Sequence, residues 1–146
     1  MKSSSLESRR RIFGSLAGKD RRDFMEGLSV FVVSSREPES RATHLLEAMA
    51  AGVPVVGPAT GIIPEIFQHA NGGLLVPSEV PAWMLTQALE LLATMPDTAD
   101  EMGRIGSEGV NQHFSMERVA NHLIQLIENE LDLAEGQSLR KYAVDV

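Results

Sequence analysis

The sequence predicts an α/β fold in which a parallel sheet is flanked by helices. Three short runs of apolar, β-branched and aromatic residues, 30–33, 53–57 and 74–76, have the composition of strands covered on both faces. Segments with helical periodicity lie between and after these runs, and the connecting loops are short. Strands that alternate with helices in this way favour parallel pairing within one sheet.

The bulk composition indicates a single globular domain and excludes several kinds of site. The 146 residues are 43% hydrophobic and 23% charged, with a net charge of −7 and scattered basic residues, which argues against a nucleic-acid surface. The absence of cysteine excludes disulfides, thiolate metal sites and thiol nucleophiles. No signal peptide or transmembrane run is found, so we expect a cytoplasmic protein, with peripheral membrane association left open.

The N-terminal part contains a disordered segment, a strand and a helix in this interpretation. Residues 1–11 are rich in Ser and Arg and are expected to be disordered. Residues 11–14 are predicted to form a short strand that ends in a glycine turn. Residues 19–28 place Phe24, Met25 and Leu28 on one side, which is typical of an amphipathic helix.

The central part contains the segment on which the functional interpretation depends. After the strand at 30–33, a polar loop at 34–40 leads into a short Ala/Leu/Met-rich helix that carries Glu47 and stops at Gly52. Pro64 and Glu65 have the composition of the first turn of another helix. Residues 71–73 then form a turn into the third strand.

Three helices are predicted in the C-terminal part. The first covers residues 81–94, and the second, near 100–110, is weakened by three glycines. Ser115 is a suitable N-cap for the last helix. Its apolar stripe consists of Met116, Val119, Ala120, Leu123, Ile124, Ile127 and Leu131. Residues 134–146 are treated as a C-terminal tail.

The chemistry is expected at the C-terminal ends of the strands, where parallel sheets bind ligands. Glu39 and Ser40 lie there, followed by the free backbone amides of a helix start near Arg41 to His44. These amides and the helix dipole form an anion site that suits a phosphate, to which Arg41 could add a bidentate contact. Glu47, in the second turn, could accept hydrogen bonds from the two hydroxyls of a ribose, and Glu39 could face a second polyhydroxylated group.

Each of these residues also has an ordinary structural interpretation. Glu47 taken alone is more often a solvated helix residue, and Glu39 a loop charge paired with Arg41. His44 is then a histidine at the edge of the core. The other histidines lack the spacing of metal ligands: His69, His113 and His122.

Several ordered motifs resemble the retaining glycosyltransferases of the GT-B type, group 1. Glu39 and Glu47 fit the E-x7-E motif of that family. The remaining similarity is carried by LSVFVVSS, LLEAMAAGVPVV, GIIPEI, NGGLLVPS and MGRIGSEGVNQHFSMERVANHL, and it covers roughly residues 12–130.

The resemblance implies that residues 12–133 are part of the Rossmann-like C-terminal domain that binds a nucleotide-diphosphate sugar of the UDP or GDP type. It assigns the ribose hydroxyls to Glu47 and the donor sugar to Glu39, the expected catalytic residue. It assigns the pyrophosphate to the backbone near Ala42, Thr43 and His44, beside Ser40 and Arg41, and the base to Leu16. It also implies that no metal or cofactor is bound.

The sequence departs from the family pattern in two ways. Arg41 and Ala42 stand where the family usually has a glycine, and Ser29 replaces an aspartate. The acceptor-binding N-terminal domain and the first two strand–helix units are not found. We therefore expect a partial product, or one completed by another chain, that leaves a sheet edge open and is inactive alone. Alternatives are a non-catalytic nucleotide- or sugar-binding module and a structural partner subunit.

Overall fold

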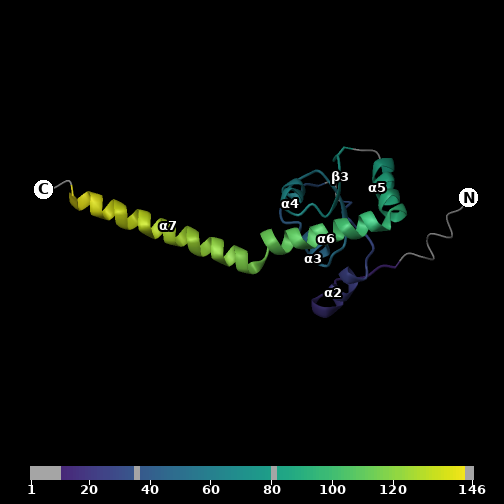
Figure 1. Cartoon of the computed structure of the whole chain (residues 1–146), viewed down its shortest axis with the longest axis horizontal. Coiled ribbons are helices and arrows are strands. Elements are labelled where there is room, and N and C mark those ends of the chain that lie inside the picture. The colour runs from purple at the N-terminus through teal and green to yellow at the C-terminus, as the bar shows by residue number, and fades with distance from the viewer. Residues whose placement is uncertain (1–10, 35–36, 80–81, 144–146) are drawn as a thin grey trace, which may run out of the picture.

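The computed structural model describes residues 11–34, 37–79 and 82–143, and its centre is a three-stranded parallel sheet (Figure 1). The strands lie in the order β1 (Phe31–Val32), β2 (Val55–Pro58) and β3 (Gly73–Val76). Phe31 is paired with Val55, and Val56 with Leu74. The predicted fold class and the strands predicted at 30–33, 53–57 and 74–76 are therefore confirmed, whereas the expected disorder of residues 1–10 lies outside the described residues.

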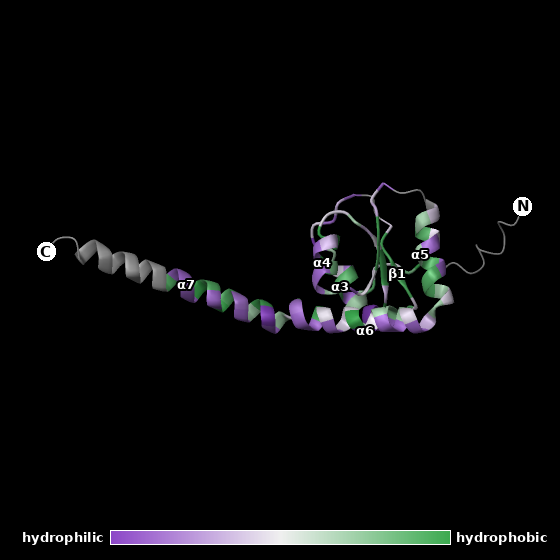
Figure 2. Cartoon of the chain, turned by 45° about the horizontal axis from the view of Figure 1, so that its top comes forward, coloured by the Kyte–Doolittle hydropathy of each residue, from purple (hydrophilic) through white to green (hydrophobic). Residues whose placement is uncertain are grey.

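Helices cover both faces of this sheet. Figure 2 shows the strands between α5 on one side and α3 and α4 on the other, with α6 crossing below them. The α4 and α6 helices each have proline in their first turn, as favoured where a backbone donor has no partner. The helices are α2 (Gly18–Glu26), α3 (Thr43–Ala50), α4 (Ile63–His69), α5 (Ala82–Thr94), α6 (Pro96–His113) and α7 (Met116–Ala143).

Adjacent residues of β2 anchor two separate apolar cores, since successive side chains of a strand point to opposite faces. Val55 packs with the fully buried side chains of α3 and α4, among them Leu45, Met49 and Ile63. Val56 packs with Ala88, Leu92 and Ala99 from α5 and α6, together with half-buried neighbours. The central strand β2, which follows α3, is thus completely buried.

The strand predicted at residues 11–14 is wrong, because this segment is irregular and exposed. Ile12 is 83% exposed and Phe13 is 53% exposed, although the Phe13 ring lies 5.1 Å from that of Phe24. A strand forms only where a neighbour satisfies its backbone groups. Among the described residues β1 pairs with β2 alone, so the expected open sheet edge is present at β1.

The glycines of α6 do not interrupt it, since the helix runs unbroken over 18 residues. Instead they lie on the face that touches three turns of the backbone. A methyl group at any of them would collide with main-chain atoms, so glycine is what permits the approach. A Cβ atom at Gly103 would lie 2.0 Å from the Gly52 oxygen, one at Gly106 2.8 Å from the Gly72 Cα, and one at Gly109 2.6 Å from the Ala70 Cα.

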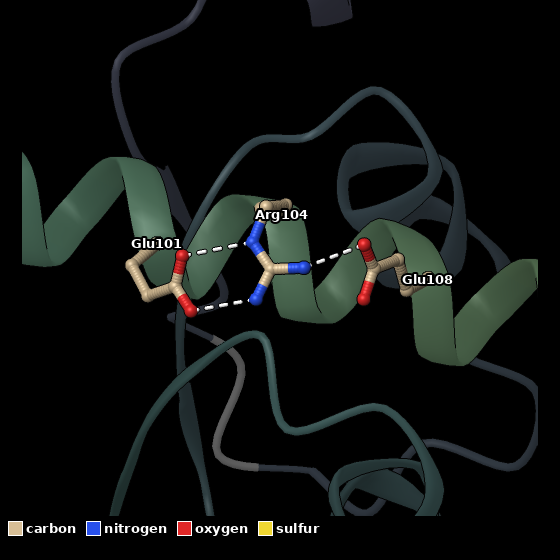
Figure 3. Close-up of polar contacts among 3 residues, drawn as sticks. All are labelled: Glu101, Arg104 and Glu108. Carbon is tan, nitrogen blue, oxygen red and sulfur yellow. Dashed lines mark hydrogen bonds and ion pairs between the residues drawn. The ribbon is translucent and has the colours of Figure 1, made fainter.

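The opposite face of α6 carries a small ion-pair network (Figure 3). Arg104 donates to both carboxylate oxygens of Glu101, at 2.8 and 2.6 Å, and to Glu108 at 2.5 Å. The hydrogen bond from Arg104 lowers the pKa of Glu101 below its ordinary value of 4.5. Any stability from this pairing is present at neutral pH and is lost as the pH falls through that lowered pKa, and solvent screening keeps it small.

The last helix, α7, extends away from the rest of the protein (Figures 1 and 2). The predicted N-cap is confirmed, because the Arg118 amide donates to the Ser115 hydroxyl at 3.3 Å. The helix continues through residues 134–143 of the predicted tail. Six side chains of its apolar stripe are between 51% and 82% exposed: Met116, Val119, Leu123, Ile124, Ile127 and Leu131. No helix in the described part of the chain has the length and apolar character that a membrane crossing needs.

We predict that Gly103→Ala destabilises the protein although alanine is the better helix former. The propensity gain is about 1 kcal/mol, whereas overpacking against the Gly52 carbonyl costs about 1–3 kcal/mol. Urea unfolding followed by circular dichroism measures the difference. Gly14→Ala is the control, since no atom lies within 4 Å of the added methyl group. A Gly103→Ala protein more stable than the wild type would contradict the proposed contact.

Candidate functional site

The loops that follow β1 and β2 contact each other at Glu39. The Ile62 amide donates to the Glu39 carbonyl at 3.0 Å. Gly61, with φ of 56°, is so close that a Cβ atom there would lie 2.4 Å from the same carbonyl oxygen. Only glycine fits this combination of a left-handed backbone and a close approach. The second loop therefore fixes the backbone of Glu39 at the C-terminal edge of the sheet.

The side chain of Glu39 is held by the first turn of α3. Its carboxylate oxygen Oε2 lies 3.3 Å from Nε2 of His44, and the Glu39 and His44 side chains are 23% and 33% exposed. The His44 ring in turn lies 5.8 Å from the Phe31 ring of β1. The pair is a charged one only when His44 is protonated. Glu39 is thus partnered by His44 and not by Arg41, which is exposed and has no recorded ion pair within the described segments.

Ala42, at the N-terminus of α3, has the left-handed backbone conformation that glycine favours. Its φ and ψ are 46° and 37°, and it is the one non-glycine residue with positive φ among those described. For an L-residue this conformation costs about 1–2 kcal/mol. The residue is only 2% exposed, so neighbouring packing holds it in place. Alanine thus reproduces here the backbone turn for which the sequence resemblance leads us to expect glycine.

This turn leaves the positive end of α3 open for an anion. The Ala42 carbonyl accepts from the amides of Leu45 and Leu46, at 3.0 and 3.2 Å, but no acceptor from the described residues is recorded for the amides of Thr43 and His44. The helix has no side-chain cap and no acidic residue in its first turn. Ser40, Arg41 and Thr43 are exposed around it. Free amides and an uncompensated dipole suit a phosphate group.

Glu47, one turn further along α3, forms an ion pair with Arg21 of α2. Arg21 Nε donates to Glu47 Oε2 at 2.6 Å, and Nη2 contacts the same oxygen. No partner in the described part of the chain is recorded for the other oxygen, Oε1. The two side chains, 40% and 39% exposed, line a cavity of about 450 Å³ together with Gly18, Arg22, Met25, Glu26, Ala50 and Ala51.

The structure brings together some of the predicted residues and separates others. Residues 39–44 lie at the mouth of α3, whereas Glu47 lines the cavity between α2 and α3, and no recorded cavity within the described residues contains both glutamates. Leu16 is half-buried in the segment before α2 and does not line that cavity, although Gly18 does. The roles assigned to these residues therefore stay predictions.

Arg21 and Gly61 are the residues of this region that the sequence interpretation missed. Arg21 appears in sequence only as one charge of an amphipathic helix, and its partner is 26 positions away. Gly61 forms its contact with Glu39 only through tertiary structure. No local pattern would have identified either contact.

A larger cavity of about 970 Å³ lies elsewhere, where α4 and α6 meet the start of α7. The rings of His69 and His113 lie 5.1 Å apart beside it, and His122 also lines it. No group of three or more potential metal ligands is found among the described residues. This cavity shares no lining residue with the mouth of α3.

Comparison with known proteins gives consistent matches. The sequence profile described as "Glycosyl transferases group 1" matches residues 1–94. N-acetyl-alpha-D-glucosaminyl L-malate synthase of Bacillus anthracis is 36% identical over 85 residues, which are 58% of this chain and 22% of that protein. Alpha-maltose-1-phosphate synthase of Mycolicibacterium smegmatis is 32% identical over 111 residues, 72% of this chain and 28% of that protein.

A solved structure agrees with these matches. Sucrose-phosphate synthase from Thermosynechococcus elongatus superposes with a TM-score of 0.67 at 30% sequence identity, over 75% of this chain and 27% of that chain. The match confirms the expected fold class. The chain spans roughly a quarter of the length of each of these proteins.

We predict different responses to glycine at two buried alanines of this region. Ala48→Gly, inside α3, should lower the free energy of unfolding by about 1 kcal/mol through helix propensity alone. Ala42→Gly loses a similar buried methyl group but relieves the left-handed strain, so it should be more stable than Ala48→Gly by about 1–2 kcal/mol. Ala42 and Ala48 are 2% and 0% exposed, which makes them a matched pair for urea unfolding. Equal losses would show that Ala42 is not strained.

Proposed function

The chain belongs to the group 1 glycosyl transferases, and we propose that it forms the donor-binding part of a retaining enzyme of this family. The observation that supports the proposal most directly is the left-handed turn at Ala42, which leaves free amides between Glu39 and Glu47. In this proposal the donor is a nucleoside-diphosphate sugar of the UDP or GDP type. The related proteins are named for different sugar products, and the proposal therefore assigns no particular sugar.

The pyrophosphate of the donor would bind at the mouth of α3. The amides of Thr43 and His44 donate to its oxygens, and the helix dipole favours its negative charge. Arg41, exposed beside them, can add a charged contact, and Ser40 a hydroxyl. Ala42 itself is buried, so the contact with the phosphate would be made by the amides that follow it.

The two glutamates would bind the two polyhydroxylated groups of the donor. Glu47 has one oxygen fixed by Arg21, and Oε1 can accept from the ribose hydroxyls. Leu16, before α2, is assigned to the base on the strength of the resemblance. Glu39, fixed by its carbonyl and by His44, would lie beside the donor sugar.

The chemical step would break the bond between the anomeric carbon and the diphosphate and form one to the acceptor oxygen with retained configuration, while the departing diphosphate takes up the proton of the acceptor hydroxyl. Positive charge develops on the sugar ring, and negative charge develops on the departing diphosphate. Preorganised amides at the mouth of α3 would stabilise that negative charge, which is usually the largest catalytic contribution of this kind. Glu39 would act on the sugar side, and neither metal nor cofactor is part of the proposal.

The acceptor site would lie outside the donor-binding part. The segments that match this chain make up roughly a quarter of each matched protein, and β1 presents an open edge among the described residues. We therefore propose that an acceptor-binding domain or another chain completes the enzyme, in the cytoplasm. A binding module without activity is the alternative, because the chain contains the proposed donor site but no proposed acceptor site.

Titration calorimetry with UDP and GDP tests the donor site. We expect one of them to bind the wild type and Glu47→Gln to weaken that binding about tenfold or more, since a hydrogen bond to a charged group is worth roughly 1.5–3 kcal/mol. Glu90→Gln is the control, as Glu90 is an exposed residue of α5. Binding of neither nucleotide, or binding unaffected by Glu47→Gln, would contradict the proposal.

A transfer assay tests whether the chain acts alone. With UDP- and GDP-sugars, we expect neither hydrolysis nor transfer, because the acceptor site is proposed to lie outside the chain. Nucleotide release measured by a coupled assay is the readout. Turnover that disappears in Glu39→Gln would show that this chain is an active enzyme without further parts.

A further inference from the structure

The ion pair between Arg21 and Glu47 joins α2 to α3 at the edge of the 450 Å³ cavity. Nε and Nη2 of Arg21 both contact Oε2 of Glu47, so the guanidinium approaches the Glu47 carboxylate from one side. Glu47 Oε1 has no recorded partner in the described part of the chain. Because Arg21 contacts only Oε2, the other oxygen, Oε1, keeps its full capacity to accept hydrogen bonds from a ligand.

The pair contributes little to the stability of the fold itself. Both side chains are about 40% exposed, and exposed pairs of this kind are weak. The α2 helix has its own apolar anchor, since Met25 is 6% exposed and packs in the same core as Leu45 and Met49. The helix therefore does not need Arg21 to stay in place, and the effect of the pair falls on Glu47.

We propose that Arg21 is a positioning residue that holds Glu47 ready to bind the ribose hydroxyls of the donor. The inference rests on the proposed function, because it concerns the same nucleotide site. A free glutamate side chain loses rotamer freedom when it binds a ligand, and a side chain already fixed by a neighbour loses less.

The adjacent residue Arg22 provides a matched comparison. It is exposed and lines the same cavity, but no ion pair is recorded for it among the described residues. Arg21→Gln and Arg22→Gln therefore remove the same charge from the same cavity, and only the first removes the contact with Glu47. A general electrostatic effect on an anionic nucleotide would appear in both variants.

The experiment measures nucleotide binding by calorimetry in the full chain, with UDP, GDP and their 2′,3′-dideoxy analogues. We expect Arg21→Gln to weaken binding of the ribonucleotide about twofold to tenfold, which corresponds to the freezing of one side chain. Arg22→Gln should have a smaller effect. The dideoxy analogue should bind wild type and Arg21→Gln equally well, and Arg21→Gln should have no further effect in a Glu47→Gln background.

Two outcomes would overturn the inference while leaving the donor site intact. One is wild-type binding that Arg21→Gln does not change. The other is an equal loss for the ribonucleotide and the dideoxy analogue, which would make the role of Arg21 independent of the hydroxyls. If the wild type binds neither nucleotide, the donor site and the role of Arg21 are both refuted. Circular dichroism of Arg21→Gln checks that α2 remains folded.

Discussion

The close contact between the backbones of Glu39 and Gly61 is the constraint on which the arrangement of the site depends. It fastens the loop after β1 to the loop after β2, so the entrance to α3 is set by the sheet and not by the loops alone. With Glu39 fixed on one side and the buried residues of α3 on the other, the chain between them must turn tightly at Ala42. The left-handed backbone at that residue is the geometric result of these two anchors.

Much of the fold could be predicted because its signals are local. The runs at 30–33 and 53–57 contain enough β-branched residues to identify two strands, and Gly52 and Pro64 mark helix boundaries correctly. The strand at residues 11–14 was predicted wrongly because composition says nothing about whether a neighbouring strand exists. The packing role of the glycines of α6 could not be predicted for a related reason, since it consists of contacts with Gly52, Gly72 and Ala70.

The site shows the same division between local and tertiary information. The spacing of Glu39 and Glu47 pointed to the entrance of α3, and the free amides of Thr43 and His44 are found there. The partners of the two glutamates could not be predicted, because Arg21 reaches Glu47 only through the packing of α2 on α3. Ala42 departs from the glycine expected from the resemblance, yet the backbone there keeps the left-handed turn that glycine favours.

The glycine face of α6 has a consequence for how this chain can vary in length. Gly103, Gly106 and Gly109 contact three separate bends of the main chain, so the spacing of those bends must match the spacing of the glycines along the helix. A residue inserted or deleted near Gly52 or between Ala70 and Gly72 would shift that bend along the helix and break its contact with the glycine.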